Sequence, residues 1–416
     1  MKFAEFGLDA KISKSIEQMG YKRPTDIQYK AIPAILKGED VLAIAQTGTG
    51  KSAAFVIPVL QLLQKKRKSK DNKGVRCIVM VPTHELALQI TDVFKQIGKY
   101  TSLKFTAIFG GVDQKEQVER LQEGTDILIA TPGRLFDFIN QGHVKVYNAE
   151  MLVLDEADHM LDLGFIKDIE DLIKYLPKNR QTLFFSATID KKIKKLAYSL
   201  VRKPIRIQIS PKNPVAKNID HSVAFIKMDD KRFFLERIIK ENPDKKILAF
   251  VRTKVRCERV LKAMERVEIN SVTIHSDKTQ EERNAAMDAF KSGEVKLLIA
   301  TDVSARGIDI PNVDYVVNYD IPEQPENYVH RVGRTGRGKQ KGYAVAFCSE
   351  EENELLAEIE KYVGQPVDVT DIDRNEYADT IDFSSEASND WKTLMREAEE
   401  DEISYKATKK KRKKKK

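Results

Sequence analysis

A glycine-rich segment from Ala45 to Ser52 has the residue types and spacing of a phosphate-binding loop, with Ala45 in place of the first glycine. Gly48 and Gly50 let backbone N–H groups turn toward phosphate oxygens, and the N-terminus of the following helix assists them. Lys51 can reach the β- and γ-phosphates of a nucleotide, and the Ser52 hydroxyl can bind Mg²⁺. A glycine-rich turn with an accidental Lys-Ser is the alternative. The other loop residues expected to contact ATP are Gln46, Thr47 and Thr49.

A second chemical signal is a pair of carboxylates that follows the apolar run Met151–Leu154. Asp155 is suited to hold Mg²⁺, largely through its water shell, and Glu156 to orient and deprotonate the attacking water. A solvated acidic turn is the alternative, but the phosphate loop upstream disfavours it. Together the loop and the carboxylates predict a Mg²⁺-dependent ATPase, without indicating what the hydrolysis drives.

Both halves of the chain alternate short β-rich runs with longer amphipathic runs such as 83–99 and 279–290. Strands that are apolar almost throughout indicate parallel sheets covered on both faces. The sequence therefore predicts an α/β protein that uses one architecture twice. The predicted strands are 41–45, 75–81, 105–109, 127–130, 152–154 and 182–185 in the first half, and 222–226, 246–251, 271–274, 296–300, 315–318 and 343–347 in the second.

The 416 residues are too many for one compact core, so two domains are expected. A segment at 206–218 that contains Pro211 and Pro214 shows little helical periodicity and is predicted to be a linker. It separates a domain at 1–205 from a domain at 219–365. The alternation of β-rich and amphipathic runs ends at about residue 365, and 366–416 is predicted to be a flexible tail.

The net charge of +8 is concentrated at the C-terminus. Residues 406–416 contain nine basic and no acidic side chains, so subtracting these nine from +8 leaves the rest of the chain at −1. Such a block cannot bury apolar surface, and we expect it to be disordered. It is either a solubilising end or, the interpretation that we prefer, an electrostatic arm for nucleic acid.

The cysteines and the hydropathy of the chain indicate in which cellular compartment the protein is located. Cys77, Cys257 and Cys348 are far apart and fit neither a disulfide framework nor a zinc site. The chain has no apolar run of about 18 residues and no secretory signal pattern at its start. We therefore expect no membrane partner and a cytoplasmic location.

Residues 155–158 spell Asp-Glu-Ala-Asp, and with the ordered motifs around them the chain resembles the DEAD-box RNA helicases over about residues 1–365. The resemblance looks closest to the bacterial RhlE-like branch. It implies two tandem RecA-like domains that use ATP and Mg²⁺ to unwind short RNA duplexes locally and to remodel ribonucleoproteins. RNA, largely independent of its sequence, is the implied partner, and ribosomal or RNA-decay proteins are left open.

In the first domain the resemblance implies that Phe3, Tyr21 and Gln28 contact the adenine of ATP, and that Ser186 and Thr188 couple the ATP and RNA sites through the acidic loop. His84 stands where the family usually has arginine. It is either a weaker, pH-sensitive phosphate contact or a solvent-facing helix residue. The implied RNA contacts are Pro82, Thr83, Gly110, Gly111, Thr131, Pro132, Gly133 and Arg134.

In the second domain the resemblance implies that Arg334 and Arg337 are arginine fingers that reach the γ-phosphate when the domains close. Asp309 is implied to bind the ribose of ATP, and His330 to connect the fingers to the acidic loop. The implied RNA-side residues are Thr301 and Arg306, with His275, Gln280 and Arg283 nearby. The remaining histidines, His143, His159 and His221, are expected to be structural or exposed.

Two other functions are compatible with part of this pattern. An ATP-gated RNA clamp would bind without unwinding, but Glu156 and both arginines argue against it. A DNA translocase would share the paired ATPase domains but would not need the adenine-reading segment.

Deleting 406–416 should weaken RNA affinity without disabling ATP hydrolysis, because the phosphate loop, acidic loop and arginines all precede residue 340. If the arm engages about four phosphates of single-stranded RNA, its removal should flatten the slope of log affinity against log salt by roughly 3. The measurement is RNA binding over a salt series, paired with ATPase titrations. An unchanged slope would make the tail a solubilising end.

Overall fold

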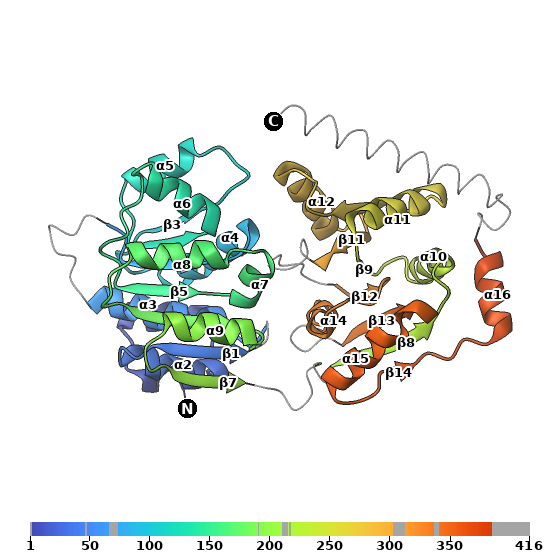
Figure 1. Ribbon diagram of the computed structural model, residues 1–416, viewed down its shortest axis with the longest axis horizontal. Coiled ribbons are helices and arrows are strands. Elements are labelled where there is room, and N and C mark those ends of the chain that lie inside the picture. Colours follow the sequence, from blue (N-terminus) through green and yellow to red (C-terminus); the bar gives the residue numbers. More distant parts are fainter. Residues whose placement is uncertain are drawn as a thin grey trace.

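The computed structural model describes residues 2–45, 48–65, 74–189, 191–209, 215, 218–302, 313–336 and 341–384. These residues form two lobes that lie side by side, each built on a seven-stranded sheet (Figure 1). Every strand pairing within the two sheets is parallel. The predicted α/β fold with two parallel sheets is confirmed.

The N-terminal lobe orders its strands β3-β4-β2-β5-β6-β1-β7. These are β1 (Val41–Ala45), β2 (Cys77–Met80), β3 (Phe105–Ile108), β4 (Ile127–Ala130), β5 (Met151–Leu154), β6 (Gln181–Ser186) and β7 (Ile205–Ile209). One face is covered by α1 (Ala10–Gln18), α2 (Asp26–Leu36), α3 (Lys51–Lys65) and α4 (His84–Ile97), after the short η1 (Phe3–Phe6). The other face is covered by α5 (Lys115–Gln122), α6 (Pro132–Asn140), α7 (Ala157–Asp162), α8 (Ile166–Tyr175) and α9 (Lys191–Leu200).

The C-terminal lobe orders its strands β10-β11-β9-β12-β13-β8-β14. These are β8 (Ile219–Phe225), β9 (Ile247–Val251), β10 (Ser271–Ile274), β11 (Leu297–Thr301), β12 (Tyr315–Asn318), β13 (Gly342–Cys348) and β14 (Asp368–Val369). One face carries α10 (Lys231–Glu241), α11 (Lys254–Arg266) and α16 (Arg374–Asp382). The other carries α12 (Gln280–Ser292), α14 (Pro325–Val332) and α15 (Asn353–Val363), which follows η2 (Glu350–Glu352).

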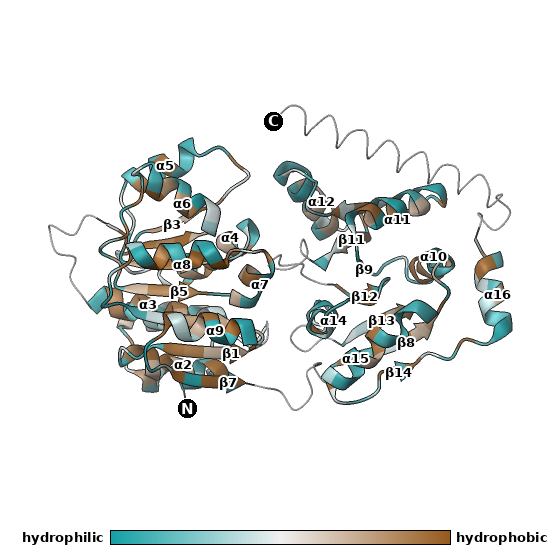
Figure 2. Cartoon of the chain, in the orientation of Figure 1, coloured by the Kyte–Doolittle hydropathy of each residue, from teal (hydrophilic) through white to brown (hydrophobic). Residues whose placement is uncertain are grey.

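Burial explains the parallel arrangement. The central strands β1, β2, β4, β5, β9 and β11 are buried along their whole length, and they form the hydrophobic centre of each lobe (Figure 2). A strand can be apolar on both faces only when helices cover both, which requires crossover connections and hence parallel neighbours. Each carboxyl edge then gathers the loops that follow several strands, and such an edge is where α/β proteins bind ligands.

Three elements correct the sequence analysis. Residues 205–209, placed mostly in the linker, form β7, which pairs with β1 at the edge of the first sheet. Residues 366–384, placed in the flexible tail, contain β14 and α16. The lysine-rich end and most of the predicted linker lie outside the described residues.

Helix α16 is anchored on α10 through Tyr377. The Tyr377 hydroxyl donates to an Asp230 carboxylate oxygen at 2.8 Å and accepts from the Lys227 backbone N–H at 3.1 Å. Its ring lies 5.0 Å from that of Phe234, between centroids. The C-terminal lobe therefore extends to at least residue 384, whose hydroxyl donates to Glu236 at 2.6 Å.

The three cysteines are free and buried, Cys77 in β2, Cys257 in α11 and Cys348 in β13. Burial raises the pKa of all three thiols, to about 12 for Cys257 and about 11 for Cys348. No helix in the part of the chain that the structure describes is long and apolar enough to cross a bilayer.

Tyr377→Ala should lower the free energy of unfolding by about 2 kcal/mol, because it removes a half-buried ring and two hydrogen bonds. Tyr377→Phe should cost about 1 kcal/mol, since the ring contact remains. Urea denaturation measures both, with Tyr175→Ala, on an exposed side chain of α8, as the control. A Tyr377→Ala protein as stable as the control would show that α16 does not contribute to the lobe.

Candidate nucleotide site between the lobes

The phosphate loop begins where β1 ends and leads directly into α3. Gly48 and Gly50 have φ of 80° and 91°, a left-handed conformation that side chains disfavour. A Cβ on Gly50 would lie 2.5 Å from the Gln28 amide nitrogen, so that position also requires glycine for space. Ser52 is the second residue of α3, half buried at the start of the helix. Gln46 and Thr47 lie outside the described residues.

Lys51 carries a buried ammonium group, since its side chain is only 6% exposed. Its Nζ has no hydrogen-bond partner among the described residues. It lies close enough to Asp155 and Glu156 to lower the pKa of both carboxyls. A buried, unpartnered ammonium in a phosphate loop fits a bound anion such as the β- and γ-phosphates of ATP.

The two carboxylates follow β5 and differ in ionisation. Burial raises the pKa of Asp155 to about 6, although Lys51 opposes this shift. Burial also acts to raise the pKa of Glu156, but the contact with His159 and the positive charges of Lys51 and Arg334 outweigh it and lower that pKa to about 2. Glu156 is therefore ionised at neutral pH. Neighbouring carboxylates with separated pKa values suit different chemical roles.

The backbone of Glu156 is strained. Its φ and ψ of 51° and 49° are left-handed, which is uncommon for a residue with a side chain. Glu156 N–H donates to the Asp155 carboxylate at 3.0 Å, and Glu156 Oε2 lies 3.5 Å from His159 Nδ1. His159, expected to be structural or exposed, is buried and lies three residues after Glu156, at the spacing of one helix turn.

Thr188 joins the acidic loop to the end of β6. Asp158 Oδ2 accepts from the backbone N–H groups of Ala187 and Thr188 at 3.1 and 3.0 Å, and from the Thr188 hydroxyl at 3.3 Å. The corresponding bond expected from Ser186 is not seen, because its buried hydroxyl has no hydrogen-bond partner among the described residues. Ala187 and Thr188 thus link the end of this strand to the acidic loop, and Thr188 does so through its side chain as well as its backbone.

The adenine-reading segment packs beside the phosphate loop. Gln28 accepts from the Thr25 backbone N–H at 3.0 Å and donates to the Gly50 carbonyl at 3.1 Å. Each end of an amide can form a second hydrogen bond, so one donor and one acceptor remain for a base. Phe3 is buried, and its ring centroid lies 6.1 Å from that of Tyr21.

The C-terminal lobe contributes Arg334 to this site. Only 8% of it is exposed, and its charge helps to lower the pKa of Glu156 in the other lobe. It follows α14, which is held by Arg331, a residue that sequence reasoning did not single out. Arg331 donates from Nε and Nη2 to the two Asp302 oxygens at 2.6 and 2.7 Å. His330 is half buried on the same helix, whereas Asp309 and Arg337 lie outside the described residues.

The implied RNA residues of the N-terminal lobe follow three adjacent strands, β2, β4 and β3. Thr83 caps α4, its hydroxyl accepting from the Leu86 N–H at 3.3 Å. Thr131 is the N-cap residue of α6, and Arg134 donates to the Val112 carbonyl at 3.0 Å. Pro82 and Pro132 are buried, and Gly110, Gly111 and Gly133 are exposed. In the C-terminal lobe Thr301 ends β11, and Arg306 lies outside the described residues.

The lobes also touch beside the implied RNA residues, between α4 and α12. Glu85 of α4 lies 2.9 Å from Arg283 of α12 and accepts from Gln280 at 3.2 Å. His84 stacks on Phe109 with 3.6 Å between ring centroids, and burial lowers its pKa. At neutral pH His84 is uncharged and packs against an aromatic ring. His275 bonds within its own lobe, 2.7 Å from Glu258.

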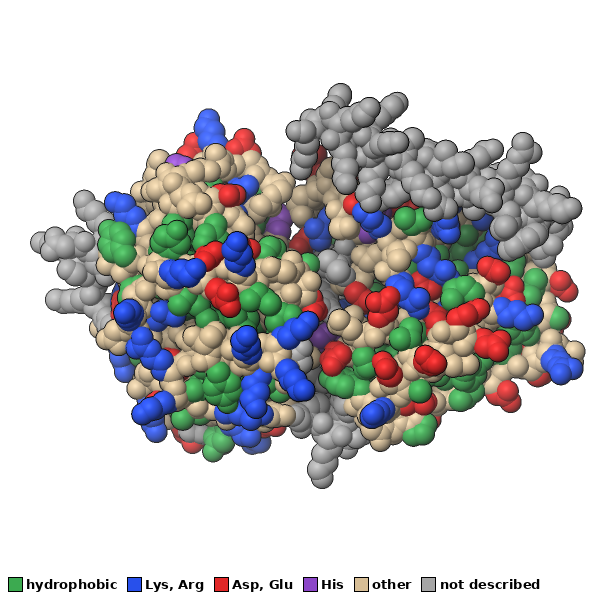
Figure 3. Space-filling model, in the orientation of Figure 1, with side chains coloured by type: hydrophobic (Ala, Val, Ile, Leu, Met, Phe, Trp, Pro, Cys, Tyr) green, Lys and Arg blue, Asp and Glu red, His purple; other side chains and the backbone are tan. Residues whose placement is uncertain are grey.

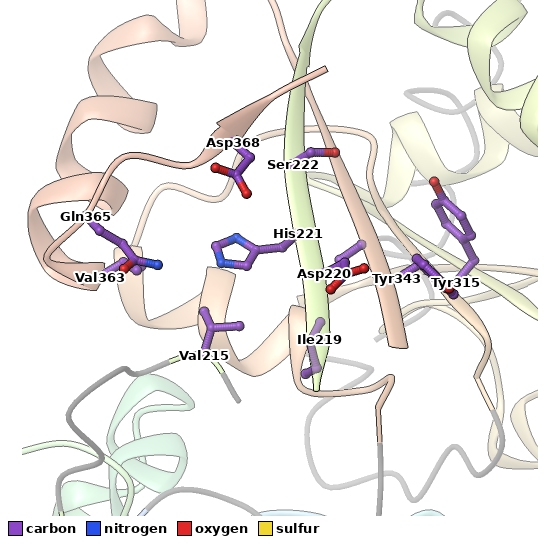
Figure 4. A pocket seen from close by; sticks show the side chains of 11 residues that line it. Val215, Ile219, Asp220, His221, Ser222, Tyr315, Tyr343, Val363, Gln365 and Asp368 are labelled. Carbon is purple, nitrogen blue, oxygen red and sulfur yellow. The ribbon is translucent and has the colours of Figure 1, made fainter. Parts of the chain in front are cut away.

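A cavity of about 650 Å³ lies at the amino edge of the second sheet, apart from the carboxylates. His221 points between Val363, Gln365 and Asp368 (Figure 4). Its Nδ1 lies 2.9 Å from the Tyr328 hydroxyl, and burial lowers its pKa. The histidine is thus a packed structural residue, as expected from the sequence.

Taken together, these contacts define a class of protein in which one nucleotide site is shared by two parallel-sheet lobes. A family model described as DEAD/DEAH box helicase matches residues 25–196, and one described as helicase conserved C-terminal domain matches 230–339. The chain belongs to the DEAD-box ATP-dependent RNA helicases.

Several relatives carry this family name. RhpA from Helicobacter pylori, a DEAD-box ATP-dependent RNA helicase, is 38% identical over 89% of this chain and 74% of its own. RhlB from Shewanella frigidimarina, an ATP-dependent RNA helicase, is 38% identical over 91% of this chain and 88% of its own. The structure of S. cerevisiae Dbp5 bound to RNA and ADP BeF3 has a TM-score of 0.79 and 30% identity, covering 89% of this chain and 95% of that one. Placement in the RhlE-like branch stays a prediction.

Glu156→Gln should leave ATP binding intact and lower turnover at least 100-fold, since the amide cannot take a proton from water. Steady-state hydrolysis and nucleotide binding measure the two effects. Asp162→Asn, an exposed carboxylate at the end of α7, is the matched control. Turnover close to the control would exclude Glu156 as the base.

Arg334→Ala should lower the RNA-stimulated hydrolysis rate about 1,000-fold with little change in nucleotide affinity without RNA, because an arginine finger acts in the transition state. Arg334→Lys keeps the charge without the planar fork and should recover only part of the rate. Full hydrolysis by Arg334→Ala would contradict its placement at the γ-phosphate.

Proposed function

We propose that this protein couples ATP binding and hydrolysis to the local unwinding of short RNA duplexes and to ribonucleoprotein remodelling. The observation that carries the proposal is that Arg334 of the C-terminal lobe is buried near enough to Glu156 of the N-terminal lobe for its charge to lower the pKa of that carboxyl. A catalytic centre completed only when the lobes meet makes hydrolysis depend on their closure. Any ligand that favours the closed arrangement therefore stimulates the ATPase.

The nucleotide would lie between the phosphate loop and Arg334. Lys51 and the loop N–H groups would hold the phosphates, and Gln28 would read the adenine with its remaining donor and acceptor. The Ser52 hydroxyl and the Asp155 carboxylate fit Mg²⁺, an oxygen-preferring ion, with Asp155 acting partly through water. When bound, Mg²⁺ would neutralise charge that develops on the phosphates. Glu156 would orient the attacking water and take its proton.

RNA would bind on the edge formed by the loops after β2, β3 and β4, with Thr301 from the opposite lobe. Helix N-termini and exposed glycines there suit contacts with phosphates, which carry no sequence information. Closure would bend the bound strand so that it leaves the duplex geometry, and hydrolysis would reopen the lobes. Thr188, bonded to Asp158, would couple the two events.

We place the protein in the cytoplasm. All three cysteines are described, and each is a free, buried thiol, which suits a reducing compartment. The relatives named above are helicases of RNA, which supports an RNA substrate for this chain.

Two assays test the function. Single-stranded RNA should stimulate ATP hydrolysis more than single-stranded DNA of the same sequence, and a short RNA duplex should separate only when ATP is present. Equal stimulation by DNA would favour a DNA translocase. RNA-stimulated hydrolysis without strand separation would favour an RNA clamp.

A further inference from the structure

A strongly basic surface covers α9 and the start of β7, and the helicase function does not use it. From residue 191 to residue 219 the chain has no Asp or Glu. We call this surface the α9–β7 basic face, and Lys and Arg side chains gather over α9 in Figure 3. Its residues are all exposed, and none forms an ion pair with a described residue: Lys191, Lys192, Lys194, Lys195, Arg202, Lys203 and Arg206.

The arrangement of these lysines works against helix stability. Four of the first five residues of α9 are lysines, and its first turn has no acidic residue. The N-terminus of a helix carries partial positive charge and favours acidic side chains, so cations there are unfavourable. Lys191 also repels Lys194 and Lys195, three and four residues on. A folding requirement therefore does not explain the cluster, which points to an anionic partner.

The chemistry of the face fits the phosphate backbone of RNA. The ten residues of α9 span about 15 Å, which matches several successive phosphates. Tyr198, 47% exposed, lies among the lysines and offers a ring that can stack on a base. Among the described residues 191–209, Tyr198 and Ile205 are the large apolar side chains that are exposed. A protein interface or a membrane-inserted helix would need a larger apolar surface.

The position of the face separates it from the RNA edge between the lobes. In the strand order, β7 is four places from β2 and six from β3, or about 19 to 29 Å at the usual spacing between strands. That distance corresponds to roughly six to nine phosphates along one strand. Helix α9 starts three residues after Thr188, so it begins at the carboxyl edge of the sheet and runs away from it.

We propose that the α9–β7 basic face is a second RNA-binding surface, which holds the phosphate backbone of RNA that extends beyond the segment bound between the lobes. The proposal rests on the RNA helicase function proposed above. It gives the protein a preference for unwinding sites that are flanked by further RNA. Because the contacts are with phosphates, the flanking sequence does not matter.

The test is a variant with Lys191→Gln, Lys192→Gln, Lys194→Gln and Lys195→Gln. Its matched control changes four exposed lysines that are scattered over other surfaces: Lys11→Gln, Lys245→Gln, Lys291→Gln and Lys361→Gln. Two RNAs are compared: a single strand of about six nucleotides, which has too few phosphates to occupy the RNA edge and also reach the face, and the same strand joined to a long hairpin. Binding of each is measured over a salt series, together with RNA-stimulated ATP hydrolysis.

For the hairpin RNA, the α9 variant should show a slope of log affinity against log salt that is flatter by roughly 2.7, if about three phosphates are lost. For the short strand, affinity and maximal ATPase rate should equal those of the control. The melting temperature of the variant should be unchanged or higher, since unfavourable charges are removed from the start of α9.

Three results would overturn the proposal. Equal salt slopes for the α9 variant and the control would show a merely solvated face. A lower melting temperature than that of the control would show that the lysines are structural. Loss of binding to phosphatidylserine vesicles with unchanged RNA binding would assign the face to a lipid surface. If the short strand fails to stimulate ATP hydrolysis even in the unaltered protein, the helicase function fails instead.

Discussion

The rest of the structure depends on one constraint, which is that the buried positive charge of the Lys51 ammonium group must be neutralised. A charge removed from water is costly unless opposite charge surrounds it, and the described residues give Lys51 carboxylates nearby but no hydrogen bond. The first sheet meets this requirement by placing β1 and β5 so that the phosphate loop and the carboxylates share one edge. A nucleotide phosphate would complete the neutralisation. The buried positive charge of the lobe without ligand therefore favours the binding of ATP.

The second lobe is organised to present one more cation to the same centre. Arg331 is almost completely buried, yet it binds Asp302 through two hydrogen bonds and the Asp320 carbonyl through a third, at 2.7 Å. These bonds fix α14 to the ends of β11 and β12. These bonds also help to position Arg334, which follows the helix. The buried Arg331 thus supports the proposed catalytic role of Arg334.

The contact between Glu85 and Arg283 serves the other side of the interface. It joins α4, whose N-terminus lies on the RNA edge, to α12 of the C-terminal lobe. In the proposed mechanism, closure of the nucleotide site and alignment of the RNA edge would therefore occur in the same movement, which would couple the two sites.

The sequence was sufficient where one strong physical requirement determines the structure. The strands β1, β4, β10 and β12 have the bounds predicted, and for β1 and β4 the reason is that a strand buried along its whole length must be apolar throughout. Strand β7 was missed because it lies at a sheet edge, exposes Ile205 and Arg206, and follows Pro204. Helix α16 was missed because Tyr377 and polar contacts with Arg237, rather than an apolar stripe, hold it against α10. The roles of His159 and Arg331 depend on which residues meet in space, which spacing alone does not reveal.

The buried cysteines have a practical consequence for following the lobes in motion. Thiolate is the form that reacts with maleimide dyes, and a buried thiol with a raised pKa is protected both from ionisation and from access. Fluorophores attached to cysteines introduced at exposed positions, such as Tyr147 and Val369, would therefore report from one lobe each. Energy transfer between them could record opening and closing of single molecules in the native-cysteine protein.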